Sequence, residues 1–348
     1  MTSHTWADVL STLIRRDDLS ADQAAWAMGA ILVGEATDAQ IAGFAVGLRS
    51  KGETAEELAA IVGTMRSLGE RVPVPAGLEG RLIDTCGTGG DRAGTVNVST
   101  MAAIVACAAG AKVAKHGNRA QSSQSGSADV LEVLGVVIDL GPEGVAHCLD
   151  QVGIGFCFAP RFHPAMRFAG PVRRDLGAPT TFNFLGPLAN PAGVRRQAIG
   201  VSDPAMAERM LRALHRLGTD RAVAFHGLDG LDELTITGPS RVYSLQDGDI
   251  VVSEVSPEDV GLSRAPLRAL AGGDAATNAE VCRRVLAGET GAVREVVLLN
   301  AAAALLVDGI AADLTEGVAL SARAIDRGAA AGVLDAWIEC SRAAADGA

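Results

Sequence analysis

The sequence has 348 residues and a formal net charge of −11 at neutral pH. That length allows two or three domains, and the acidic balance argues against nucleic acid or an anionic membrane as the main partner. No uninterrupted apolar run reaches the roughly 18 residues that a membrane-crossing helix needs, and no basic segment followed by an apolar one opens the chain. We therefore expect a cytoplasmic protein that acts on small molecules, with neither nucleic acid nor membrane as a partner.

Residues 3–71 have the apolar spacing of short helices. Three helices open with Ser or Thr followed three residues later by Gln or Glu, the capping-box pattern: Ser20 with Gln23, Thr37 with Gln40, and Thr54 with Glu57. Because four short helices make a poor core by themselves, this unit must pack on the rest of the chain or on a second copy. The proline-rich residues 72–77 then indicate a stiff, non-helical hinge.

Residues 84–135 carry three polar, Gly- or Ser-rich segments separated by apolar ones. The first is the loop Cys-Gly-Thr-Gly-Gly-Asp at 86–91, and the second, at 97–100, precedes a helix expected to open at Ser99 or Thr100. The third follows the next expected strand and holds Lys115, His116, Asn118, Arg119, Ser122, Ser123, Ser125 and Ser127. Glycine amides, a helix N-terminus, hydroxyls and the positive charge expected of Lys115, His116 and Arg119 together suit a phosphorylated anion.

The glycine loop at 86–91 fits no common nucleotide motif when taken alone. It lacks both the G-x-G-x-x-G spacing and the Gly-Lys-Ser/Thr of a P-loop, and an ordinary strand-to-helix turn would use the same residues. However, this loop and the third polar segment would both lie at the carboxyl ends of parallel strands, where α/β sheets bind ligands. A ligand site is the better interpretation of the two together.

Further strands are expected at 136–138 and 155–159. His163 follows the second of these, and for it a ligand contact and a structural turn are equally open. Prolines and glycines interrupt residues 167–193 too often for one long helix, so we expect short helices and turns that could cross back onto the N-terminal unit. A local basic run suits a small anionic substrate: Arg161, His163, Arg167, Arg173, Arg174, Arg195 and Arg196.

From residue 198 the alternation of strand and helix resumes. A strand expected at 222–225 is followed by Asp232-Glu233, adjacent carboxylates with no basic neighbour in sequence. Such a pair suits Mg²⁺, which proteins hold through few carboxylates and ligand phosphates, and a surface acidic turn is the alternative. A hairpin is expected over 241–255, and the Ala-rich remainder is expected to be helical, with 271–279 and 297–302 in packing roles.

The six cysteines show neither C-x-x-C pairs nor a His spacing suited to zinc, so we expect free thiols. Cys86 lies beside the glycine loop, and it is the cysteine whose reactivity the sequence leaves open.

Taken together, these segments resemble the anthranilate phosphoribosyltransferase family over nearly the whole chain. The matching motifs lie at 84–91, 97–100, 115–119, 125–129, 171–174, 176–177, 181–183, 185–188 and 190–191. The resemblance implies an α/β protein of the nucleoside phosphorylase-like phosphoribosyltransferase fold, with a small all-helical domain and a large α/β domain around a mostly parallel central sheet. We expect the helical domain at 1–71, completed by helices from 171–193, the hinge at 72–77, and the large domain at 78–170 and 194–348.

The implied reaction transfers phosphoribose from 5-phosphoribosyl 1-diphosphate to the amino group of anthranilate, releasing diphosphate, in tryptophan biosynthesis. The residues implied for phosphoribosyl diphosphate are Gly87, Thr88, Gly89, Gly90, Asp91, Thr95, Asn97, Ser99, Thr100, Lys115 and Ser127. Those implied for anthranilate are Gly87, His116, Asn118, His163 and Arg173, with Arg173 on the carboxylate.

The resemblance also implies two Mg²⁺ ions per site, with Ser99, Asp232 and Glu233 as ligands, and a homodimer formed through the helical domain. Lys115 would act electrostatically. No general base is needed, because the aromatic amine of anthranilate is already neutral at pH 7.

Two alternatives stay open. A pyrimidine nucleoside phosphorylase-like enzyme of the same fold would use the phosphate-binding residues but not Arg173 with Asn118. A nucleic-acid-binding relative without transferase activity would require a basic outer surface, which the charge of −11 opposes.

Overall fold

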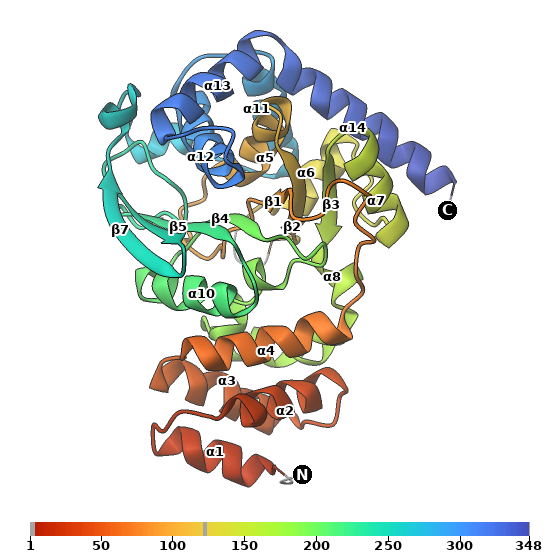
Figure 1. Ribbon diagram of the computed structural model, residues 1–348, viewed down its shortest axis with the longest axis vertical. Helices are drawn as coiled ribbons and strands as arrows, with labels where there is room; N and C mark the ends of the chain where they lie inside the picture. The colour runs from red at the N-terminus through yellow and green to blue at the C-terminus, as the bar shows by residue number, and fades with distance from the viewer. Residues whose placement is uncertain (1–3, 121–123, 348) are drawn as a thin grey trace.

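The computed structural model describes residues 4–120 and 124–347, and it has a base of helices beneath a sheet that further helices cover (Figure 1). The base consists of α1 (Trp6–Ile14), α2 (Ala21–Leu32), α3 (Asp38–Lys51) and α4 (Ala55–Leu68). The predicted capping boxes are confirmed: Ser20, Thr37 and Thr54 each exchange hydrogen bonds with the residue three positions on. The connector at 72–77 is non-helical, as expected.

Within the described residues, seven strands form one sheet in the order β3-β2-β1-β4-β5-β6-β7. The strands are β1 (Leu82–Asp84), β2 (Lys112–Gly117), β3 (Ile154–Phe158), β4 (Arg196–Gly200), β5 (Arg221–Gly227), β6 (Ser240–Gln246) and β7 (Asp249–Val255). β1 to β5 are parallel, whereas β6 and β7 form the predicted antiparallel hairpin. From β1 the chain proceeds to β2 and β3 on one side and later returns to β4 on the other. Sheets of this kind bind ligands at such a reversal.

Two apolar cores lie on opposite faces of the sheet. The upper core includes α5 (Val98–Ala108), α6 (Ser127–Leu134), α7 (Pro142–Gln151), α11 (Ala275–Leu286), α12 (Ala292–Asp308), α13 (Leu314–Asp326) and α14 (Ala329–Asp346). The lower core joins the helical base to α10 (Pro204–Arg216) and to the sheet. Successive residues of β4 enter different cores, Ala198 the upper and Ile199 the lower, because strand side chains alternate between faces. The base therefore shares its core with the sheet.

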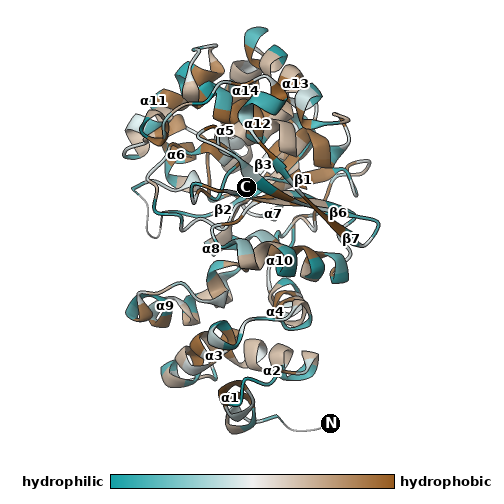
Figure 2. Ribbon diagram, turned by 90° about the vertical axis from the view of Figure 1, so that its left-hand side faces the viewer, coloured by the Kyte–Doolittle hydropathy of each residue, from teal (hydrophilic) through white to brown (hydrophobic). Residues whose placement is uncertain are grey.

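Between β3 and β4 the chain crosses back to the base in short helices, as predicted. These are α8 (Ala159–Phe162), η1 (Pro164–Phe168), α9 (Gly170–Leu176), η2 (Thr181–Asn183) and η3 (Pro187–Ala189). α9 lies beside α3 (Figure 2), and η2 and η3 pack on α3 and α4, respectively. We call residues 159–190 the crossing segment. Two more 3-10 helices, η4 (Pro257–Val260) and η5 (Leu267–Leu270), follow the hairpin.

Three local predictions were wrong. Residues 136–138 form no strand, because Val137 donates its amide to Ser341 Oγ of α14 at 3.0 Å instead of to a strand neighbour. α5 begins at Val98, one residue earlier than expected. Lys115 and His116 lie inside β2 instead of after it.

No helix among the described residues is long and apolar enough to span a bilayer.

Candidate active site

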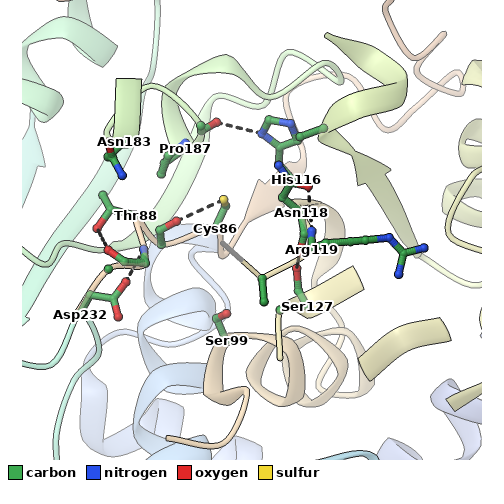
Figure 3. A pocket seen from close by; sticks show the side chains of 18 of the residues that line it. Cys86, Thr88, Ser99, His116, Asn118, Arg119, Ser127, Asn183, Pro187 and Asp232 are labelled. Atoms are coloured by element: carbon green, nitrogen blue, oxygen red, sulfur yellow. Dashed lines mark hydrogen bonds between the residues drawn. The ribbon is translucent and has the colours of Figure 1, made fainter. Parts of the chain in front are cut away.

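A cavity of about 530 Å³ lies at the carboxyl ends of β1, β2 and β3, beside the loop after β5, and is bordered by the crossing segment. Every residue that the family resemblance assigns to a substrate or to Mg²⁺ lines it except Thr100, which is buried in α5 outside the lining. Figure 3 shows Thr88, Asp232, Ser99 and His116 around this space. The sequence therefore identified residues from distant parts of the chain that share one cavity.

The glycine loop is tied to the end of β4. Thr88 donates its N–H to Gly200 O at 2.9 Å, and the two hydroxyls of Thr88 and Ser202 lie 3.1 Å apart. Gly89 and Gly90 have φ angles of 65° and 92°, in the left-handed region that glycine adopts without a steric penalty. The loop thus joins β1 and β4 at the point where the sheet order reverses.

Lys115, in the second half of β2, is a basic residue that is only 1% exposed. Its Nζ lies 3.3 Å from both Thr85 Oγ1 and Ser99 Oγ and 3.4 Å from Thr85 O. These neutral oxygens hold the ammonium group beside the N-terminus of α5, whose helix dipole also attracts anions. A phosphate in the cavity would meet both positive features.

Asp232 and Glu233 lie in the loop after β5, where Asp232 Oδ2 accepts the N–H of Gly89 at 2.6 Å. Burial first, and then the neighbouring Asp91 carboxylate, raise the pKa of Asp232 to about 7. Burial, and then the charge of Asp232, raise the pKa of Glu233. A divalent cation relieves this repulsion, so the carboxylates fit Mg²⁺. In the described ranges no group of three or more His, Cys, Asp or Glu is arranged to hold a metal ion.

The other side of the cavity carries His116 and His163. His116 Nδ1 lies 2.8 Å from Gly186 O, and His163 Nε2 lies 2.8 Å from Ala189 O. Loss of hydration, and then the proximity of His163, lower the pKa of His116 to about 3. Loss of hydration also lowers the pKa of His163. His116 is therefore neutral, and the prediction that it adds positive charge was wrong.

Arg119 also differs from its prediction. Its guanidinium binds Glu132 at 2.8 and 3.1 Å and Asp129 at 3.0 Å, and Figure 3 shows it extending away from Ser99 and Asp232. The acids neutralise its charge, so it adds no positive charge to the phosphate side. By contrast, Arg173 lies near the end of α9 in the cavity wall, and burial lowers the pKa of its guanidinium.

The predicted basic run is dispersed in the fold. Arg161 pairs with Glu70, Arg195 with Asp220 and Arg196 with Asp308. Of the run, His163, Arg167 and Arg173 line the cavity.

Sequence reasoning missed Asp84, which connects the two sides of the cavity. One of its oxygens accepts the N–H groups of Cys86 and His116 at 3.0 and 3.1 Å, and the other accepts Asn190 Nδ2 at 2.8 Å. Burial raises the pKa of Asp84 to about 6, although the charge of Lys115 opposes the shift. The one feature of the sequence that could have identified Asp84 is an acidic side chain at the end of an apolar strand.

Asn300, assigned to packing, instead holds the acidic loop by hydrogen bonds. Its side chain bonds both backbone groups of Leu234, with Leu234 N to Asn300 Oδ1 at 3.0 Å and Asn300 Nδ2 to Leu234 O at 2.9 Å. Leu234 directly follows Glu233, so this clamp fixes where the carboxylates project.

The six cysteines are free thiols, as predicted. Burial, and then the charge of Asp84, raise the pKa of Cys86, so its thiol stays protonated and is a poor nucleophile despite lining the cavity. Ser122 and Ser123, predicted as hydroxyl donors, lie outside the described residues.

Known proteins resemble the chain in both of its parts. Residues 79–331 match the family described as "Glycosyl transferase family, a/b domain", and residues 7–69 match "Glycosyl transferase family, helical bundle domain". The anthranilate phosphoribosyltransferase of a Nocardioides species is 57% identical over 339 residues, which cover 96% of this chain and 98% of that protein. The enzyme of the same name from Salinispora arenicola is 52% identical, covering 99% and 98%.

Solved structures give the same result. The anthranilate phosphoribosyltransferase of Thermus thermophilus has a TM-score of 0.90 at 42% identity and covers 96% of this chain and 99% of its own. That of Saccharomyces cerevisiae, in complex with PRPP and Mg, has a TM-score of 0.89 at 26% identity, covering 97% and 98%.

Proposed function

The chain belongs to the anthranilate phosphoribosyltransferase family, and on this basis we propose how its cavity carries out the reaction. The protein transfers the phosphoribosyl group of phosphoribosyl diphosphate to the amino group of anthranilate and releases diphosphate, a step of tryptophan biosynthesis. One observation carries this conclusion: paired carboxylates and a buried Lys115 share a single cavity with two neutral histidines and Arg173. One side suits a diphosphate with its cation, and the other suits an aromatic acid.

The phosphate side is assigned to phosphoribosyl diphosphate. Amides of the glycine loop and of the first turn of α5 supply donors for phosphate oxygens, and Lys115 supplies charge. Thr100 lies in that turn, so its backbone N–H can serve although its side chain is outside the lining. The assigned residues are Gly87, Thr88, Gly89, Gly90, Asp91, Thr95, Asn97, Ser99, Thr100, Lys115 and Ser127.

Asp232 and Glu233 are assigned to Mg²⁺, with Ser99 as a further ligand and two ions per site. Mg²⁺ keeps most of its octahedral shell for water and phosphate oxygens, which agrees with so small a set of protein donors. When bound, the ions neutralise the negative charge that develops on the leaving diphosphate.

The opposite side is assigned to anthranilate. The guanidinium fork of Arg173 matches a carboxylate bidentately, whereas the neutral rings of His116 and His163 can lie against an aromatic ring without charge. Gly87 and Asn118 complete this set in the lining. Because the amine of anthranilate is neutral at pH 7, its lone pair is available without a general base.

The displacement is dissociative, so the bond from the anomeric carbon to diphosphate breaks ahead of the new bond to nitrogen. Positive charge develops on the sugar and negative charge on diphosphate. Thr85 and Ser99 hold Lys115 in place, so its ammonium group stabilises the negative charge on diphosphate without having to move. The remaining contribution is positioning, because the cavity holds amine and anomeric carbon together.

The same proposal covers the assembly. We assign the helical domain to 1–71 with helices from 171–193, the hinge to 72–77 and the large domain to 78–170 with 194–348, in a cytoplasmic homodimer joined through the helical domain. Exposed apolar side chains on the base support a partner there: Ile14, Val33 and Val46 are 82%, 54% and 44% exposed.

Loss of anthranilate fluorescence tests the reaction directly. The purified protein is mixed with anthranilate, phosphoribosyl diphosphate and Mg²⁺, and each component is omitted in turn. We expect the signal to fall only when all three are present. Unchanged fluorescence in the complete mixture would overturn the function.

A further inference from the structure

The segment Ala-Gly-Gly-Asp at 271–274, with Asn278 at the start of α11, lies against the phosphate side of the cavity. Thr95 and Ala271 form an antiparallel bridge, and Val96 N donates to Leu270 O at 3.0 Å. A Cβ at Gly272 would lie 2.7 Å from Thr95 O, a contact that only glycine avoids. The sequence indicated only a packing role for this segment, yet the segment directly supports residues 95–97.

A chain of three hydrogen bonds runs from this segment into the cavity wall. Gly273 N donates to Asn278 Oδ1 at 2.8 Å, Asn278 Nδ2 donates to Asn97 Oδ1 at 2.8 Å, and Asn97 Nδ2 donates to Ser125 O at 3.2 Å. Asn278 is buried, whereas Asn97 lines the cavity.

Both ends of this chain are backbone groups with fixed roles. The N–H of Gly273 can only donate, so the Asn278 atom that faces it must be the oxygen, and its nitrogen must then face Asn97. The carbonyl of Ser125 can only accept, so the Asn97 atom that faces it must be the nitrogen. The amide of Asn97 therefore has one orientation, with its oxygen occupied by Asn278.

We propose that Asn278 is a positioning residue that orients Asn97 so that its N–H, and not its carbonyl oxygen, faces phosphoribosyl diphosphate. This inference rests on the function proposed above. The nitrogen of Asn97 carries two hydrogens and uses one on Ser125, so the second can bind a phosphate oxygen, which only accepts. A reversed amide would instead turn an acceptor toward an anion.

The test is a double-mutant cycle of Asn97→Ala and Asn278→Ala, with KM for both substrates and kcat measured in the fluorescence assay. We expect Asn278→Ala to raise KM for phosphoribosyl diphosphate about tenfold, the size of one lost hydrogen bond to a charged group, while KM for anthranilate changes less than twofold. On the Asn97→Ala background the same substitution should change neither KM. The wild-type protein is measured in the same experiment. If it is inactive, the proposed reaction is refuted, and that outcome is distinct from a failure of the role proposed for Asn278.

Asn278→Asp is the second variant, in case the alanine protein fails to fold. Aspartate can still accept from Gly273 N, but its carboxylate cannot donate to Asn97, so KM for phosphoribosyl diphosphate should again rise about tenfold. Combined with Asn97→Ala, this substitution still adds a carboxylate but has no Asn97 amide to orient. KM for phosphoribosyl diphosphate should then rise less than threefold relative to Asn97→Ala alone.

Asp274→Ala is the matched control. It removes the cap in which Asp274 Oδ1 accepts Thr277 N at 2.8 Å, and so weakens the same helix without touching Asn97. We expect a lower melting temperature with an unchanged KM. A similar rise in KM for phosphoribosyl diphosphate in this control would overturn the proposal. So would a tenfold rise caused by Asn278→Ala in a protein that already carries Asn97→Ala, because Asn278 would then act on the structure and not through Asn97.

Discussion

His116 and His163 meet edge to face in the cavity wall, with ring centroids 5.4 Å apart and an interplanar angle of 66°. Their bonded nitrogens contact carbonyls only three residues apart, Gly186 O and Ala189 O. The crossing segment thus fixes both rings at once. Because burial disfavours the charged form of both rings, Arg173 is the residue to which we assign the anthranilate carboxylate in the proposed site.

Replacement of Arg173 by Ala should raise KM for anthranilate about 30- to 100-fold, since a charge-assisted contact to a carboxylate is lost. KM for phosphoribosyl diphosphate should change less than threefold. Arg174→Ala removes the same charge from an exposed neighbour and should leave both values unchanged. Equal effects of Arg173→Ala on the two substrates would contradict the carboxylate assignment.

The double variant Asp232→Asn, Glu233→Gln should need at least tenfold more Mg²⁺ for half-maximal rate, or lose turnover, because neutral amides are weak Mg²⁺ ligands. The measurement is a Mg²⁺ titration at saturating substrates. Asp247→Asn with Asp249→Asn neutralises two exposed acids of the β6–β7 hairpin and serves as the control. An unchanged titration in the Asp232 and Glu233 variant would remove these residues from the metal site.

Asp84 should make stability depend on pH. Its pKa is raised by burial from 3.8 to about 6, so its stabilising contribution is complete below about pH 4 and is lost as pH rises through 6. Between pH 4.5 and 7.5 the free energy of unfolding of wild type should fall by about 2 kcal/mol relative to Asp84→Asn, which cannot titrate. Urea denaturation at several pH values measures this difference.

The control for that experiment is Asp139→Asn, which removes an exposed carboxylate. Its stability should run parallel to that of wild type across the same pH range. If the curve of Asp84→Asn is parallel as well, Asp84 does not retain its proton in the folded protein.

The proposed homodimer should dissociate into single chains when charge is placed on the base. Ile14→Glu with Val46→Glu puts two carboxylates on exposed apolar positions, so light scattering after size exclusion should give the mass of one chain, 35.5 kDa. Val251→Glu adds charge to an exposed valine on β7, at the side of the sheet and away from α1 and α2 (Figure 1), and should leave the proposed dimer intact. A dimer in the first variant would place the interface elsewhere.

Local sequence patterns predicted the parts of the fold that depend on local physics. The capping boxes at Ser20, Thr37 and Thr54 need only residues three apart, and the glycine loop needs only its own backbone freedom. The family resemblance supplied the architecture and the residues that line the cavity.

The errors came from contacts between distant residues. Arg119 is basic, but two acids of α6 neutralise it, and residues 136–138 are apolar, but α14 takes the place of a strand partner. Asp84 and Asn190 are separated by 106 positions, and no local pattern pairs them. Residue types in the sequence indicated which chemistry is possible, whereas only the fold showed which charged side chains are neutralised by a distant partner.

The shared lower core also sets the order in which the chain can fold during synthesis. α1 to α4 are synthesised before the segments that share their core, because their apolar faces pack against Phe182, Leu188 and α10, which are made more than a hundred residues later. Contacts so far apart in sequence form slowly, because a long loop must close before they stabilise anything. These four helices are therefore among the last of the described elements to reach their native packing, although they are made before them, and they expose apolar surface to chaperones and to other copies in the meantime.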